Sequence, residues 1–266
     1  MSPFPGNDLP ANQPWPPVPP DLDAARIEYE LPEVSFTANS QIYRIKGHPS
    51  WVYKAGAQLR EYHLQKAAGD CAMAVGGKVL SMAGGSLSFC GFLMELAAPV
   101  PSTLPPPQRR DIMHQMIRAV QRLHARRIIH GDMKLNNMLV DGQGRLRLCD
   151  FAEGRYVDED EDEWDGISTW HYESPNRLRR GELVGRDPAP PTLEDDLYGL
   201  GLSIWQLYTG KVPHEDLILD DIGLKERQRA GKTVDVSEVH DLEARGIIIG
   251  LLRRGGGLYV DIELEY

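Results

Sequence analysis

Four polar residues between positions 132 and 150 have the types and the spacing needed for chemistry on a phosphoryl group. Asp132 can accept the proton of an attacking hydroxyl, and Lys134 can neutralise charge on a phosphoryl group during its transfer. Asn137 can offer a neutral oxygen to a magnesium ion, and Asp150 can offer a carboxylate from the end of an apolar, strand-like run. These four residues are therefore the candidates for chemistry on a phosphoryl group.

Four stretches carry a resemblance to one family. His130–Asn137 resembles the catalytic loop of protein kinases, H-R-D-x-K-x-x-N, and Leu148–Phe151 is similar to the start of their D-F-G region. Thr169–Asn176 resembles the G-T-x-x-Y-x-A/S-P-E end of the kinase activation segment. Asp196–Trp205 is similar to the family's D-V-Y-S-L-G-x-x-L-W helix. The resemblance extends over about residues 30 to 253.

The resemblance implies an α+β, protein kinase-like fold of two lobes. The N-lobe is expected to be a small antiparallel β-sheet, and the C-lobe to be larger, mainly helical and shortened at its end. We expect a proline-rich disordered tail at residues 1–27 and a kinase-like domain at 28–266. Within the domain, the N-lobe is expected at about 28–97 and the C-lobe at about 98–254.

Lys54 and Glu61 are the residues that the resemblance assigns to the nucleotide phosphates. Lys54 lies in Trp51–Ala55, which resembles the V-A-I-K strand whose lysine holds the α and β phosphates of ATP. Gly56–Ala68 has helix-forming residues, and Glu61 within it is the natural partner of Lys54. Only seven residues separate the two, so the helix has to begin almost at once. The alternative is that Glu61 is a surface charge.

Two further stretches are expected to contact the nucleotide. Thr37–Gln41 takes the place of the family's glycine-rich cover but contains no glycine, so that side chains crowd the approach to a phosphate. We assign Asn39 and Ser40 to this cover. The backbone from Glu95 to Ala97 is expected to hydrogen-bond the adenine base.

The remaining elements are expected from apolar periodicity. Gln108–Arg127 and Thr192–Thr209 read as strong helices, the second capped by Thr192 with Asp195 three residues on. Asp196 is expected to accept amides of the catalytic loop. The other expected elements are strands at 34–36, 42–45, 52–53, 78–82 and 87–96, a hairpin of 137–140 with 146–149, and weaker helices at about 217–229 and 237–253.

Thr169 matches the family pattern. It falls where Ser/Thr kinases keep a hydroxyl beside the catalytic Asp and Lys, and we assign it to the catalytic group.

Two other positions, Gly131 and Asn176, depart from the family pattern near the expected catalytic residues. The Arg of H-R-D, which in many kinases pairs with a phosphorylated loop residue, is Gly131 here, so activity is hypothesised not to depend on loop phosphorylation. The final Glu of the family's activation segment is Asn176 here. The ion pair that this Glu forms in the family is therefore either lost or replaced by a neutral hydrogen bond.

Composition limits the partners and the compartment. Of 266 residues, 41% are hydrophobic and 26% charged, which is usual for a globular protein, and the formal net charge of −10 argues against nucleic acid or an anionic membrane as partner. The three cysteines are odd in number and lie in apolar surroundings, which favours an intracellular protein, cytoplasmic or nuclear. We also expect a monomer, no secretory signal, and either no role or a proline-motif-binding partner for the N-terminal tail.

Three functions remain open on the sequence. The first is ATP- and magnesium-dependent phosphoryl transfer to Ser or Thr of protein substrates. The second is a pseudokinase that binds nucleotide or acts as a scaffold, which the glycine-free cover and Ala152 in place of the Gly of D-F-G support. The third is a small-molecule or atypical kinase, because His-Gly-Asp occurs in aminoglycoside phosphotransferases and RIO-type kinases.

Overall fold

A computed structural model describes most of the chain between residues 20 and 258. It covers 20–36, 40–83, 85–160, 164, 166, 169–185 and 188–258, with no side chains described at 29–36 and 83. By internal contacts these residues divide into two units. The first combines residues up to Val100 with Met138–Ala152, and the second combines Pro101–Asn137 with the chain from Glu153 onward.

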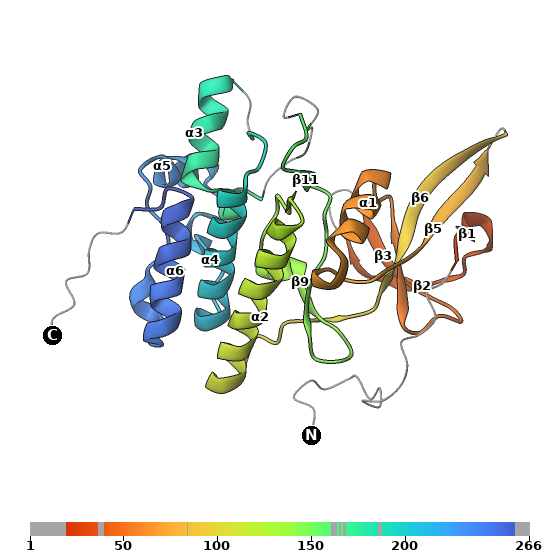
Figure 1. Ribbon diagram of the computed structural model, residues 1–266, viewed down its shortest axis with the longest axis horizontal. Coiled ribbons are helices and arrows are strands. Elements are labelled where there is room, and N and C mark those ends of the chain that lie inside the picture. Colours follow the sequence, from red (N-terminus) through yellow and green to blue (C-terminus); the bar gives the residue numbers. More distant parts are fainter. Residues whose placement is uncertain are drawn as a thin grey trace. The chain divides into compact units, whose positions relative to one another are not determined.

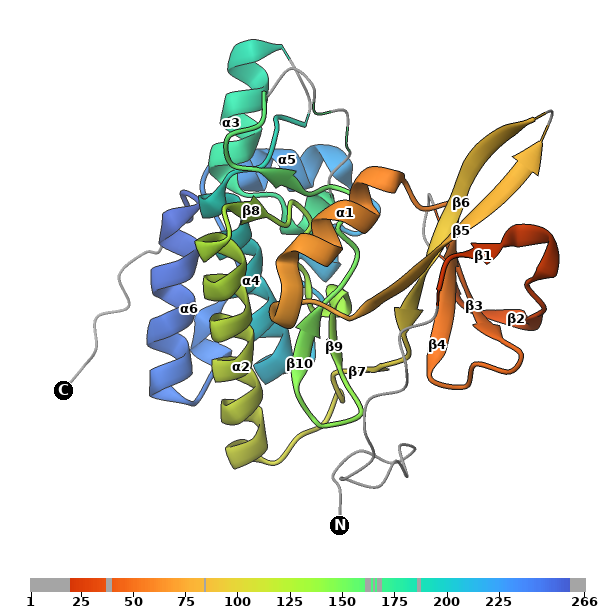
Figure 2. The same cartoon turned by 45° about the vertical axis from the view of Figure 1, so that its right-hand side comes forward.

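The first unit is built on a six-stranded sheet. Its strands are β1 (Leu22–Asp23), β2 (Tyr29–Phe36), β3 (Gln41–Ile45), β4 (Trp51–Ala55), β5 (Val75–Ala83) and β6 (Ser86–Glu95), in the order β1-β5-β6-β4-β3-β2. Only β1 pairs in parallel; the other pairs are antiparallel. The β5–β6 hairpin is long and extends past the other strands (Figure 2). Among the described residues of this unit, one α-helix is present, α1 (Leu59–Ala68).

The two faces of the sheet bury different side chains because residues alternate along each strand. Val52, Phe92 and Met94 lie on one face, where they pack with Tyr62 of α1 and with Met73. The opposite face buries a second cluster, formed by Tyr43, Ile45, Trp51, Tyr53, Val79 and Leu93. Lys54 follows Val52 by two residues, so it shares the face of the sheet that packs against α1.

A second, three-stranded sheet completes the first unit. It has the order β10-β9-β7, with β7 (Ala98–Pro99), β9 (Met138–Val140) and β10 (Leu146–Leu148). The predicted hairpin is therefore present. Because β9 pairs with β7 and the Met73 amide donates to the Leu148 carbonyl, the hairpin groups with the first unit, although the sequence analysis placed it in the expected C-lobe.

The second unit is mainly helical. Its helices are α2 (Pro106–Ala125), α3 (Pro175–Val184), α4 (Leu193–Thr209), α5 (Asp221–Arg229) and α6 (Leu242–Arg254), and a two-stranded pair joins β8 (Ile128–Ile129) to β11 (Arg155–Tyr156). Helix α4 packs between α2 and α6 (Figure 1). The fold class expected from the sequence, α+β with a β-rich first part and a helical second part, is confirmed. Among the described residues, no helix combines the length and the apolar character needed to cross a bilayer.

Helix α4 lies at the centre of the second unit. The sequence predicted an apolar stripe, but residues on nearly all sides of this helix are buried, because α2, α6 and the loop before β9 surround it. Its start is the predicted capping box: the Thr192 amide donates to the Asp195 carboxylate, and the Asp195 amide donates to the Thr192 hydroxyl. The cap fixes where the helix begins and hence where Asp196 lies.

Some elements differ from the prediction. Helix α3 was missed because its sequence is rich in charge, although Ser174-Pro175 at its start and Gly185 after its end are cap signals. Helices α5 and α6 begin later than predicted, since Asp220 and Asp241 cap them and short 3-10 turns precede them. Residues 20–27, which the sequence analysis placed in the tail, include β1, which pairs with β5; residues 1–19 lie outside the described residues.

We expect Thr192→Ala to lower the free energy of unfolding by about 1 kcal/mol, as is typical for loss of an N-cap side chain. Urea denaturation monitored by circular dichroism measures the change. Thr103→Ala, at an exposed position before α2, is the matched control and should leave the midpoint in place. Equal midpoints for both variants would show that the capping box contributes nothing.

Candidate active site

Lys54 forms the centre of a buried charge cluster in the first unit. Its ammonium donates to the Glu61 carboxylate and, at 2.6 Å, to Oδ1 of Asp150. Lys54 and Glu61 are both 2% exposed. Burial acts to lower the pKa of the Lys54 ammonium, but the two carboxylates together hold it above its ordinary value. Lys54 therefore stays charged, and its position is set by two acids from separate segments.

The short spacing between Lys54 and Glu61 is explained by how α1 begins. After β4 ends at Ala55, only three residues precede Leu59, the first residue of the helix, and the last of the three, Gln58, is its N-cap residue. Glu61 then lies in the first helical turn on the face that meets the sheet. The predicted partnership of Lys54 with Glu61 is present, and the alternative of a surface charge is wrong.

Asp150 has an uncommon backbone conformation. Its φ is +65°, a left-handed value that few residues other than glycine adopt and that Asp tolerates better than most. Such strain persists where the surroundings determine it, and here the Lys54 ammonium holds the carboxylate. The assignment of Asp150 as a metal ligand stays a prediction.

The stretch expected to bind the base is partly committed to the sheet. The Glu95 amide donates to the Ala74 carbonyl at 3.0 Å, and the Leu96 amide donates to the Ser50 carbonyl at 2.9 Å. The Ala97 amide makes no hydrogen bond with the part of the chain that the structure describes, so it is the donor left for a base. Of the expected phosphate cover, Ser40 is buried, and Asn39 lies outside the described residues.

In the second unit, Asp132 is held by three side chains. Its Oδ1 accepts from the Thr169 hydroxyl at 2.7 Å, and its Oδ2 faces the Lys134 ammonium at 2.6 Å. The same ammonium donates to Thr169 Oγ1 at 2.9 Å, which closes a triangle of contacts. Asn137 Nδ2 donates to the Asp132 backbone carbonyl and to Oδ2. The structure therefore brings Lys134, Asn137 and Thr169 together around Asp132.

The Asn137 amide is suited to a metal. Because its nitrogen is used by Asp132, the side-chain oxygen Oδ1 is the atom that faces elsewhere, and a neutral oxygen is a ligand that magnesium accepts. That Asn137 and Asp150 bind one magnesium ion is implied by the resemblance to the kinase motifs, and it remains a prediction.

Asp196, in the first turn of α4, fixes the backbone of the loop before Asp132. Its carboxylate accepts the amides of His130 at 2.8 Å and Gly131 at 2.9 Å, as expected from the sequence. It also contacts His124 Nε2 at 2.9 Å. Burial favours the neutral acid, but these hydrogen bonds outweigh it and lower the pKa of Asp196. His124 was missed, because a single histidine on a helix has no distinctive pattern; its place six residues before His130 was the available signal.

Gly131 occupies a position that only glycine fits. Its φ is +80°, and a Cβ there would lie 2.2 Å from the Glu153 carbonyl oxygen. The departure from H-R-D is therefore built into the local backbone and is more than a lost side chain.

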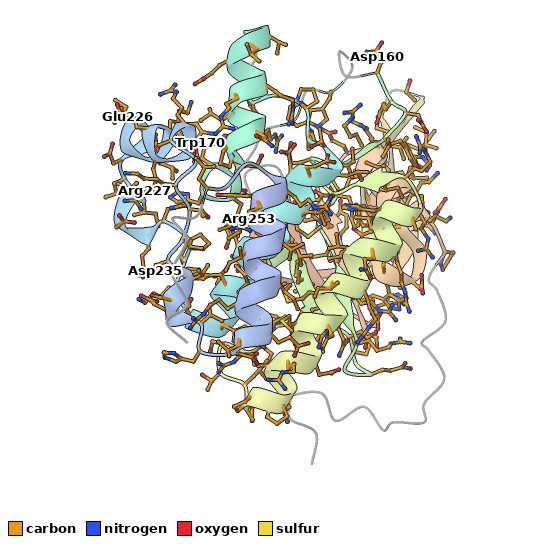
Figure 3. The ribbon with its side chains drawn as sticks, turned by 60° about the vertical axis from the view of Figure 1, so that its left-hand side comes forward. Asp160, Trp170, Glu226, Arg227, Asp235 and Arg253 are labelled. Atoms are coloured by element: carbon orange, nitrogen blue, oxygen red, sulfur yellow. The ribbon has the colours of Figure 1, made fainter. Side chains whose placement is uncertain are left out.

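The segment after Thr169 is held by α5. Gln228 Nε2 donates to the carbonyls of Trp170 and Glu173, and the Lys225 ammonium lies 4.9 Å from the centre of the Trp170 ring. Figure 3 shows Trp170 beside this helix. Asn176 donates to the Arg254 carbonyl at 3.4 Å, which is the neutral replacement that the sequence analysis allowed. These contacts stabilise the segment that carries Thr169.

Comparison with known proteins shows which proteins this chain is similar to. The model of the protein kinase domain matches residues 88–248, more than half of the chain. The chain is 31% identical over 150 residues to the serine/threonine-protein kinase ROP17 of Toxoplasma gondii, a match that covers 54% of this chain and 24% of the relative. It is 28% identical over 127 residues to PrkC of Bacillus subtilis strain 168, covering 47% and 18% respectively.

These relatives are longer than the matched region, and the chain spans about a quarter of their length or less. The matched residues 88–248 include Asp132, Lys134 and Asp150. Lys54 and Glu61 precede them, so the case for these two rests on their geometry.

We expect Lys54→Met to destabilise the protein by about 3–5 kcal/mol, because it leaves the buried Glu61 without its cation. The free energy of unfolding in urea measures this, and adding Glu61→Gln to the variant should restore part of the loss. Lys46→Met, which removes the exposed partner of Glu28, is the control and should change little. A variant as stable as the wild type would contradict the buried pair.

Glu95→Gln should change how stability depends on pH. Burial, with Asp141, raises the pKa of the Glu95 carboxyl from 4.5 to about 7, against the effect of Arg147 and Arg145. Since the folded state holds this proton more tightly, the stabilisation is complete below about pH 4.5 and is lost as the pH rises towards 7.

Between pH 4.5 and about pH 7, the Tm of the wild type should therefore fall relative to that of Glu95→Gln. Above this range, the difference between the two Tm values should stay constant. Differential scanning calorimetry across this range measures the difference. Glu226→Gln, at an exposed site on α5, is the control for replacing a carboxyl group by an amide. A constant difference for Glu95→Gln would mean that the carboxyl titrates normally.

Proposed function

The chain belongs to the protein kinase family, and we propose that it transfers the γ-phosphoryl group of ATP to serine or threonine hydroxyls of protein substrates. The observation that carries the proposal is the Asp132 carboxylate with Lys134, Thr169 and Asn137 around it. Relatives named serine/threonine-protein kinases support the choice of acceptor.

In this proposal Asp132 orients the acceptor hydroxyl and takes its proton. One carboxylate oxygen faces Thr169 and the other faces Lys134 and Asn137, so these contacts fix the orientation of the Asp132 carboxylate. Lys134 offsets the negative charge that develops between acceptor and phosphoryl group. The rate enhancement then comes mainly from position and charge.

Lys54 is proposed to hold the α and β phosphates, with Glu61 keeping its ammonium in place. Asn137 and Asp150 supply the oxygen ligands that a magnesium ion prefers, and the ion itself neutralises phosphate charge when bound. The Ala97 amide and the Glu95–Ala97 backbone are proposed to bind the base, and Ser40 with Asn39 to cover the phosphates.

Two residue choices favour this function over the alternatives. A binding module has no chemical need for a carboxylate held by both a lysine and a threonine, which argues against the pseudokinase. Small-molecule kinases generally lack the Lys134 position and the Asp196 helix motif seen here. We also propose an intracellular compartment, since Cys71, Cys90 and Cys149 are thiols and not disulfides.

Asp132→Asn should lower phosphoryl transfer by at least about 100-fold, the usual scale for losing a general base. The assay follows transfer from radiolabelled ATP, with magnesium, to casein and histone, and acid hydrolysis of the product identifies phosphoserine and phosphothreonine. Asp111→Asn, on the exposed side of α2, is the matched control and should keep full activity.

A thermal-shift titration with ATP and magnesium separates binding from transfer, because a bound nucleotide raises the Tm. The wild type and Asp132→Asn should show the same shift. A wild type that is shifted but transfers no phosphate would establish the pseudokinase reading and overturn this proposal. Phosphotyrosine as the product would overturn the choice of acceptor.

A further inference from the structure

Arg177 is a buried cation to which the proposed reaction gives no task. It is the third residue of α3, and it is 3% exposed. Its Nε donates to the Ala189 carbonyl at 2.7 Å, and its Nη1 donates to the Gly131 carbonyl at 3.1 Å. The second of these bonds ends on the residue immediately before Asp132.

The other face of the guanidinium meets Trp164. This indole comes from the segment between Asp150 and Thr169, it is 2% exposed, and its ring centre lies 5.2 Å from the Arg177 guanidinium carbon. The indole Nε1 donates to the Glu153 carbonyl at 3.1 Å. Gly166 packs so closely on this ring that a Cβ would lie 2.6 Å from it, which leaves no room for a side chain.

Nearby carboxylates offset part of the cost of burying Arg177. Burial lowers the pKa of the guanidinium, and the Asp195, Glu173 and Glu153 carboxylates counteract this only in part. A planar guanidinium can donate in two directions in its plane and stack on an indole at once, and a lysine ammonium cannot. A cation–π contact shielded from water is also stronger than an exposed one.

Arg177 thus joins two segments that matter for the reaction. Through Gly131 it holds the loop of Asp132, and through Trp164 it holds the segment that leads to Thr169. In kinases with H-R-D, the resemblance assigns a comparable link to the loop arginine and a phosphorylated residue. Here Gly131 cannot carry an arginine, because its φ and the Glu153 carbonyl exclude a side chain.

We propose that Arg177 is a positioning residue that, with Trp164, holds the Asp132 loop and the activation segment together without phosphorylation. This inference rests on the proposed kinase function and specifies how its site is regulated. The link consists only of groups within the chain, so removing phosphate leaves it intact.

The test compares Arg177→Lys, Trp164→Leu and Trp164→Phe in steady-state kinetics. Arg177→Lys keeps the charge but loses the fork and the stacking, and we expect kcat to fall at least tenfold with the KM for ATP within twofold of wild type. Trp164→Leu should show the same fall in kcat and the same unchanged KM for ATP. Trp164→Phe keeps an aromatic face and should stay within threefold of the wild-type kcat.

Arg245→Lys is the matched control. Arg245 also donates to two backbone carbonyls, those of Val239 and Ser237, but it lies on α6, away from the Asp132 loop. Its kcat should stay within twofold of wild type, and so should that of wild type treated with a phosphatase. A tenfold loss in either case would overturn the inference.

A second readout needs no activity. In ¹H–¹⁵N spectra, the Trp164 indole signal is assigned by its absence in Trp164→Phe, and its hydrogen exchange is followed. Exchange should be at least tenfold faster in Arg177→Lys and unchanged in Arg245→Lys. Unchanged exchange together with a kcat within twofold would overturn the inference. If the wild type transfers no phosphate but the exchange responds as expected, the contact stands and the proposed function fails.

Discussion

The second unit depends on one buried carboxylate, that of Asp196. A charge that is almost fully removed from water is tolerated only if hydrogen bonds replace its hydration, and three donors do so here: the amides of His130 and Gly131 and the ring of His124. Because Thr192 and Asp195 fix the start of α4, the position of Asp196 is set by the helix. The loop amides must come to it, and Asp132, next to Gly131, is placed as a consequence.

The first unit solves a similar problem with a cation. Lys54 lies on the face of β4 that meets α1, where it is 2% exposed. Glu61 and Asp150 compensate its charge. Removing Lys54 would leave Glu61 buried without its cation, and removing either acid would leave the ammonium with a single carboxylate, so the arrangement is sensitive to change in any member. Such sensitivity favours a single conformation over alternatives, and a site that acts by position and charge requires one conformation.

Predictions from sequence succeeded where spacing alone decides geometry. Asp132, Lys134 and Asn137 lie within one loop, and Lys54 and Glu61, seven residues apart, form the pair that the resemblance to the V-A-I-K strand implied. They failed for residues that neither a local pattern nor the family resemblance marks. His124 and Arg177 have no local signature, because the partners that give them meaning, Asp196 and Trp164, are far along the chain or in another element. Helix α3 was missed since its charged residues hide the apolar period, although its caps were readable.

The departure from the family pattern at Gly131 can be understood from the residues that surround it. An arginine at position 131 is excluded by the backbone, yet a guanidinium still lies beneath this loop, supplied by Arg177 from α3. A loop arginine that waits for a phosphate leaves the segment free until modification. Arg177 instead bonds to backbone carbonyls and an indole that are always present. Because the cation lies on α3 and not in the loop, the Asp132 loop and the activation segment are held together by groups of the chain itself. They do not need a phosphate that another enzyme adds.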